Sequence, residues 1–290
     1  MQSLWMLLAG LAFAGMGVCV KLASPQFSIA ELVLYRALAQ MGGAWIVLWR
    51  AHLPVRTARL GLHANRGLSG FASLFMFFYS LRELPVATAM TLNYASPLWL
   101  ALLIVFLARE RPGAGLLVCV VLGFAGVLLL LQPTLTANMA WPFAIGLVSG
   151  ILAAIAYLNV RDLVQANEPE ARVVFYFALF SAIGALVWMI PQAWTDVSLA
   201  NAWPLVGIGV CGTVGQLAMT RAYGKGSTLV AAALSYSGIV FSSILGALLL
   251  DERLPWIAWL AMVLIVAAGI MSIRMLPRTA HAEPAAVTSD

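Results

Sequence analysis

Arg36 is a charged residue inside an apolar stretch, a position that structural packing does not explain. It lies about seven residues into an apolar stretch, roughly 10 Å along a helix at 1.5 Å per residue. If that stretch crosses a bilayer, the charge costs at least about 2.5–3.5 kcal/mol, and such residues are functional candidates. A guanidinium at this depth can bind an anionic group of a solute, such as a carboxylate. The structural alternative is a contact to helix carbonyls or to another helix, because Glu31 is five residues away, a poor helical spacing.

Asn93, Tyr94, Ser96 and Pro97 form a second polar group inside an apolar stretch. Pro97 has no N–H, so the carbonyl of Asn93, four residues earlier, cannot take its usual helical hydrogen bond. A free carbonyl near the middle of a membrane, beside hydroxyls and an amide, is typical of the broken helices that form substrate sites in transporters. The alternative is a kink whose hydroxyls are satisfied within the helix.

A related segment occurs later in the chain. Tyr236 falls 142 residues after Tyr94, and Ser235 precedes it. Ile239 stands where the first segment has Pro97. We therefore expect the second segment to keep the aromatic hydroxyl but not the kink, which would make a cavity lined by both segments asymmetric.

Glu31 is a candidate proton site, because burial favours the neutral form of a carboxyl group. The alternative, which we prefer, is a glutamate at a helix start, where negative charge suits the helix dipole. Trp99 and Tyr79 could pack on the apolar part of a solute, and Gln216 could hydrogen-bond its polar part. The predicted substrate-binding residues are Arg36, Tyr79, Asn93, Tyr94, Ser96, Pro97, Trp99, Gln216, Ser235 and Tyr236.

Two glycine-rich segments match nucleotide-binding patterns only in part. Residues 207–212 fit G-x-G-x-x-G, but no strand–helix–strand unit surrounds them, and small residues in an apolar stretch pack helices closely. The segment 224–227 lacks the first glycine of a phosphate loop, because that position is Met219. No set of His, Cys, Asp and Glu has a metal-ligand spacing. We therefore expect no enzyme activity, no metal, no cofactor and no ATP-driven step.

The composition indicates where these residues are held. Apolar residues make up 63% of the 290 residues and charged residues 9%, against about 25% charged in a soluble domain. A membrane-spanning helix needs roughly 20 apolar residues. Ten such stretches are centred near Leu11, Leu38, Phe75, Leu98, Leu122, Ile151, Leu179, Gly212, Phe241 and Leu264. The sequence predicts an all-α integral membrane protein with ten transmembrane helices.

The basic residues are distributed unevenly between the two sides of the membrane. With the loop after the second span on the inside, twelve of the sixteen lysines and arginines lie on the cytoplasmic side. Only Lys21, Arg82 and Arg253 lie outside, and Arg36 lies within a span. This positive-inside pattern places both termini in the cytoplasm. It also accounts for the net charge of +5 without a nucleic-acid partner.

The ten spans form two copies of one five-span pattern. Gly150 falls 140 residues after Gly10, and Phe177 falls 141 residues after Arg36. Five is an odd number, so the second copy must enter the membrane from the opposite side, as in inverted-repeat transporters. The fifth and tenth spans are almost purely apolar and could face lipid or a second subunit in a homodimer. The expected divisions are 1–135 for the first repeat, 136–276 for the second, and 277–290 for a disordered cytoplasmic tail.

Several segments resemble the drug/metabolite transporter superfamily, and in particular its bacterial EamA-type branch. They are Asn93-Tyr94-Ala95-Ser96-Pro97-Leu98, Arg109-Glu110-Arg111, Leu248-Leu249-Leu250-Asp251-Glu252-Arg253 and Leu34-Tyr35-Arg36. The resemblance covers about residues 3–275. It implies a secondary carrier of the inner membrane, and it is specific for the family but poor for the substrate.

These observations favour an alternating-access exporter of an amino acid or an amino-acid-derived metabolite, with a metallophore among the candidates. Uptake of a nucleoside-like or vitamin compound, such as S-adenosylmethionine or riboflavin, is an alternative that would use the same fold. A channel or a non-transporting assembly protein is the alternative of a different class, and it predicts no saturable binding of a small-molecule substrate.

Overall fold

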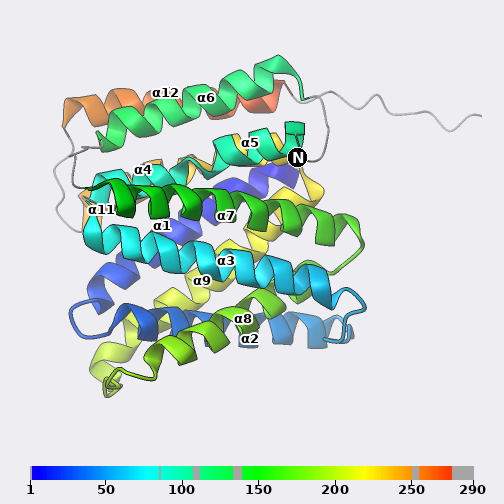
Figure 1. Cartoon of the computed structure of the whole chain (residues 1–290), viewed down its shortest axis with the longest axis vertical. Coiled ribbons are helices and arrows are strands. Elements are labelled where there is room, and N and C mark those ends of the chain that lie inside the picture. Colours follow the sequence, from blue (N-terminus) through cyan, green and yellow to red (C-terminus); the bar gives the residue numbers. More distant parts are fainter. Residues whose placement is uncertain (1, 85, 107–111, 133–138, 250–254, 276–290) are drawn as a thin grey trace, which may run out of the picture.

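The computed structural model describes residues 2–84, 86–106, 112–132, 139–249 and 255–275, and within these ranges every regular element is a helix (Figure 1). The glutamate-basic turns at 109–111 and 251–253 and the tail at 277–290 lie outside the described residues. The elements are η1 (Gln2–Leu4), α1 (Trp5–Ala23), α2 (Ile29–Arg50), α3 (Leu60–Glu83), α4 (Val86–Tyr94), α5 (Ser96–Phe106), α6 (Ala114–Leu131), α7 (Ala140–Gln165), α8 (Glu170–Met189), α9 (Leu199–Lys225), α10 (Thr228–Ser235), α11 (Ser237–Leu249) and α12 (Trp256–Arg274).

The prediction of an all-helical membrane protein is confirmed. Nine segments of the described chain are long and apolar enough to cross a membrane, and two of them combine a pair of short helices, α4 with α5 and α10 with α11. The helix α3 has 24 residues, which is long enough, but it is less apolar than the others. The count of ten spans therefore depends on α3, whose first two turns carry His63 and Arg66.

Both repeats contain a broken helix, and this corrects the expectation that only the first would be kinked. The first break separates α4 from α5 at Ala95, directly before Ser96-Pro97, as the proline predicted. The second is a one-residue interruption between α10 and α11 at Tyr236, whose φ of -62° and ψ of -21° remain helical, and no proline is present. Ser237-Gly238 follows that break, and Gly/Ser pairs kink helices as prolines do.

The first helix of each half packs against the broken helix of the other half. The helix α1 lies against α9 and α11, and α7 lies against α3, α4 and α5. A Cβ added to Gly10 would lie 3.1 Å from the backbone nitrogen of Gly238, and one added to Gly150 would lie 2.7 Å from the carbonyl oxygen of Leu92. These two glycines are equivalent in the repeat. Their lack of a side chain lets each helix approach the backbone of the opposite break.

The remaining helices form the two outer sides of the bundle (Figure 1). The apolar helices α6 and α12 pack side by side above the broken helices, and α2 and α8 pack together on the opposite side. This arrangement is consistent with the peripheral position predicted for the fifth and tenth spans. A homodimer through them stays a prediction.

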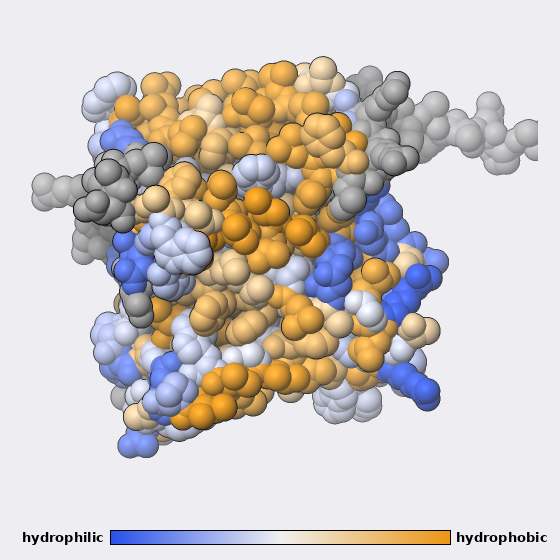
Figure 2. Space-filling view, in the orientation of Figure 1, coloured by the Kyte–Doolittle hydropathy of each residue, from blue (hydrophilic) through white to orange (hydrophobic). Residues whose placement is uncertain are grey.

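The surface has the character of a lipid-facing one. Apolar side chains cover the middle of the face in Figure 2, and hydrophilic side chains gather at its left and right edges, where the helices of Figure 1 end. Trp49, Trp141 and Trp256, close to helix ends, are 65%, 70% and 76% exposed. Soluble proteins rarely expose apolar patches above a few hundred Å². Lipid must therefore cover this face, with tryptophans near its borders.

Gly150→Ala should destabilise the protein, because the new methyl group would meet the Leu92 carbonyl oxygen, a backbone atom that cannot rotate away. Overpacking costs about 1–3 kcal/mol, so we expect a melting temperature lower by about 2–8 °C for the purified protein in nanodiscs. Gly17→Ala is the matched control, since nothing lies within 4 Å of a Cβ at Gly17. An equal loss of stability in both variants would contradict the close approach of α7 to the first break.

Candidate functional site

A cavity of about 200 Å³ lies where the two broken helices face α1, α7 and α9. Its polar lining comes from both halves of the chain. The polar side chains of the lining are those of Asn93, Tyr94, Ser96, Tyr157, Tyr223, Ser235 and Ser242, with Met6, Phe13 and Met219 as apolar neighbours. The cavity therefore combines hydroxyl and amide groups with an apolar wall, as small-molecule sites do.

Four of the predicted substrate-binding residues line this cavity: Asn93, Tyr94, Ser96 and Ser235. The hydroxyl of Tyr94 reaches the opposite half, because it would lie 4.0 Å from a Cβ added to Gly238. The Ser235 hydroxyl donates to the carbonyl of Ala232, one turn earlier, at 2.7 Å. The breaks thus bring polar groups of the two repeats to one place.

Tyr157 and Tyr223 line the cavity but were absent from the predicted set. Their rings stack with centroids 4.9 Å apart and planes 15° from parallel. Tyr223 lies two residues before the end of α9, where the sequence suggests a membrane border. A signal was available, since Gln216, Met219 and Tyr223 are spaced by three and four residues and share one face of a helix. Gln216 is buried on that face.

Arg36 lies beside the cavity, among α2, α7 and α9. Its Cγ would lie 3.2 Å from a Cβ added to Gly212 of α9, four residues before Gln216. Its charge interacts electrostatically with Tyr157, a residue of the cavity lining. Protein surrounds the side chain, although part of the residue's surface stays accessible. Its Nε has no hydrogen-bond partner.

Three predicted residues point elsewhere. Tyr79 lines a separate apolar groove with Phe75 and Trp141, and Trp99 lines another groove with Phe124. The ring of Tyr236 packs over Gly123 of α6 in an apolar cluster. Tyr94 and Tyr236 are equivalent in sequence, but only Tyr94 lines the cavity. Pro97 is buried at the start of α5, where it fixes the first break.

Glu31 is fully buried and forms the start of α2. Its carboxylate accepts a hydrogen bond from the backbone N–H of Ser28 at 2.7 Å, while the Ser28 hydroxyl accepts one from the backbone N–H of Glu31 at 3.3 Å. The carboxylate also accepts from the backbone N–H of Thr195 at 2.6 Å and from the Thr195 hydroxyl at 3.1 Å. This geometry is that of a helix capping box. It matches the preferred interpretation, and a proton-carrying role stays a prediction.

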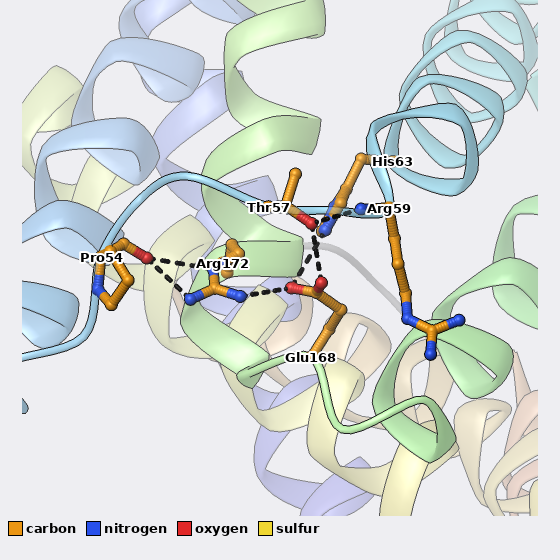
Figure 3. Close-up of polar contacts among 6 residues, drawn as sticks. All are labelled: Pro54, Thr57, Arg59, His63, Glu168 and Arg172. Carbon is orange, nitrogen blue, oxygen red and sulfur yellow. Dashed lines mark hydrogen bonds and ion pairs between the residues drawn. The ribbon is translucent and has the colours of Figure 1, made fainter.

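Glu168 is the centre of a polar cluster between the α2–α3 loop and the start of α8 (Figure 3). It accepts a hydrogen bond from Thr57 at 2.7 Å and one from Arg172 at 2.8 Å. His63 Nε2 lies 3.4 Å from the same carboxylate, and Arg172 also donates to the carbonyl of Pro54. These contacts join a loop of the first repeat to a helix of the second.

The pKa of Glu168 is set by two opposing effects. Burial acts to raise it, but the hydrogen bonds from Thr57 and Arg172 and the charge of Arg172 outweigh burial and hold the pKa below its ordinary value. Folding therefore favours the ionised carboxylate. The resulting stability is present above the unfolded pKa, about 4.3, and is lost as the pH falls through the lower folded value.

Known proteins resemble the chain in sequence and in fold. The profile of the EamA-like transporter family matches residues 1–132 and again residues 140–274. A Pseudomonas aeruginosa protein named a pseudopaline exporter is 31% identical over 275 residues, covering 92% of this chain and 91% of its own. A Vibrio cholerae protein named a riboflavin transporter is 26% identical over 280 residues, covering 91% and 90%. A solved crystal structure superposes with a TM-score of 0.82 over 94% of this chain and 98% of that one, at 19% identity.

Glu168→Gln should remove the acid sensitivity that this carboxylate gives to the fold. We expect the melting temperature at pH 7 to fall by about 3–8 °C, because a buried charge-assisted contact is lost. We expect the gap from the unmodified protein to close as the pH falls below about 4.3. Asp196→Asn is the control, since that carboxylate is exposed and makes no described side-chain contact. A gap that persists unchanged at low pH would refute the assignment to the Glu168 charge.

Proposed function

The chain belongs to the EamA-like transporter family, and on that premise we propose a secondary active exporter of the bacterial inner membrane. Its substrate would be an amino acid or an amino-acid-derived metabolite, carried by alternating access. Both termini would lie in the cytoplasm, as the distribution of basic residues suggests. The observation that supports this most directly is the polar cavity between the two broken helices.

The position of the cavity supports alternating access. It lies between helices of both repeats, and the first helix of each repeat closes on the break of the other. A rotation of one group of helices against the other would open the cavity to one side and then to the opposite side, around a fixed site. The irregular backbone at each break is tolerated because protein and not lipid surrounds it.

The lining supports a small polar substrate with an anionic end. Arg36 would bind a carboxylate, and Asn93, Tyr94, Ser96 and Ser235 would hydrogen-bond the polar part. Phe13 and its apolar neighbours would pack against the carbon skeleton. A cavity of about 200 Å³ is small beside the roughly 300–1,000 Å³ of drug-sized sites.

The direction of transport separates this proposal from its main alternative. The relative named a pseudopaline exporter supports efflux, whereas the relative named a riboflavin transporter keeps vitamin uptake as the alternative. Counterflow in proteoliposomes of known orientation distinguishes the two. Trans-stimulated efflux of an amino acid, without any exchange of riboflavin, would favour the exporter.

Arg36→Ala should reduce saturable amino-acid flux by about tenfold or more, because it removes the charge-assisted contact to the substrate. Tyr94→Phe should reduce the flux less, by about threefold to tenfold, because it removes one neutral hydrogen bond. The measurement is initial rate in proteoliposomes at matched protein incorporation.

Arg50→Ala and Tyr35→Phe are the matched controls for these substitutions. Arg50 is exposed at the end of α2, and Tyr35 packs in a separate cluster against Phe27. Unchanged transport of every carried substrate in both site variants would exclude this binding site.

A further inference from the structure

A second buried guanidinium lies near Arg36. Arg66 of α3 is only 2% exposed, and the centre of its guanidinium lies 4.1 Å from the ring centroid of Phe177. Its Nη1 occupies the space that a side chain at Gly70 would fill, one turn further along α3 toward the membrane interior. The sequence placed Arg66 in the cytoplasmic loop between the second and third spans, whereas the structure places it within α3, six residues after its start at Leu60.

Neither guanidinium forms an ion pair in the part of the chain that the structure describes. Among the described residues, no carboxylate lies within ion-pair distance of Arg36 or Arg66, and the Nε of each has no hydrogen-bond partner. The two charges are close enough to repel each other, and both interact with Tyr157 of the cavity lining. An unpaired charge in a low-dielectric interior is costly, and two like charges in one place are costlier still.

The repeat explains how the two cations reach the same region. Phe177 of α8 is the residue that corresponds to Arg36 of α2, and α2 and α8 pack against each other. The second repeat lacks an arginine at that position. Arg66 covers the face of Phe177 and supplies a positive charge there from α3. A cation therefore lies at each of two symmetry-related positions, Arg36 on α2 and Arg66 over the ring of Phe177 on α8.

Resting on the proposed transport function, we propose that Arg36 and Arg66 form a two-cation site beside Tyr157, and that the transported solute carries two carboxylate-like groups. One carboxylate would balance only one of the charges and leave the other unpaired. The face of Phe177 attracts a cation but carries no net charge. A solute with two anionic groups would satisfy both guanidiniums and remove their mutual repulsion.

Matched pairs of ligands test this site through equilibrium binding to the full-length protein in nanodiscs. Glutamate with glutamine, and succinate with succinamate, differ only in one carboxylate replaced by an amide. We expect the member with two carboxylates to bind at least about tenfold more tightly in calorimetry. Arg66→Gln should reduce its affinity to that of its amide partner and change the affinity of the amide by less than about threefold.

Two further variants separate charge from folding. Gly70→Ala keeps both charges but displaces the Arg66 guanidinium, and alanine favours a helix more than glycine does. It should also lose the preference for two carboxylates. Arg59→Gln removes an exposed cation at the start of the same helix, and it should retain the preference.

The outcomes distinguish this inference from the proposed function. No preference for the second carboxylate in either pair, or a preference that survives both Arg66→Gln and Gly70→Ala, would overturn the two-cation site. Tight binding of two-carboxylate ligands that depends on Arg66 would support the site even without flux, and absence of flux would contradict only the transport proposal. Transport of a monocarboxylate that Arg66→Gln leaves unchanged would contradict the two-cation site alone.

Discussion

A helix inside a bilayer can be interrupted only where protein surrounds the interruption, because hydrocarbon offers no partner to a free amide or carbonyl. In this chain two helices are interrupted, between α4 and α5 and between α10 and α11. The first helix of the opposite half covers each break, and Gly10 and Gly150 permit the close approach. The interlocked halves, the cavity between them and the polar groups that line it all depend on this reciprocal contact.

Different helices supply the neutral polar groups and the positive charges of the interior. The hydroxyl and amide groups come mainly from the broken helices, whereas α2 and α3 contribute the two arginines that have no ion pair among the described residues. Buried cations without counterions among the described residues are unfavourable in the empty protein, and in the proposed two-cation site the substrate would supply the missing negative charge. A bound substrate would then stabilise the loaded protein by balancing the charge of these cations.

The sequence predicted the fold class well, but it predicted only some of the residues that line the candidate site. Hydropathy and the repeat indicated two bundles of apolar helices, and Pro97 located the first break. The second break was missed because a kink was expected only from a proline. A Gly/Ser pair can also kink a helix, and Ser237-Gly238 directly follows this break. Tyr79 and Trp99 were placed at the site, but polar groups on several faces of a helix leave its rotation undetermined. Arg66 was missed because it was placed in the loop before the third span, whereas α3 begins at Leu60 and already buries this side chain.

The Glu168 cluster has a mechanical consequence. It fastens the α2–α3 loop to the start of α8 at one end of these helices (Figure 3). The same three helices carry Arg36, Arg66 and Phe177. If these contacts make the three helices move as a unit, the spacing between the two cations would stay constant while other helices open and close around the solute. Substrate selectivity would then depend on α2, α3 and α8, whose relative positions stay fixed, and gating would depend on the helices that move against them.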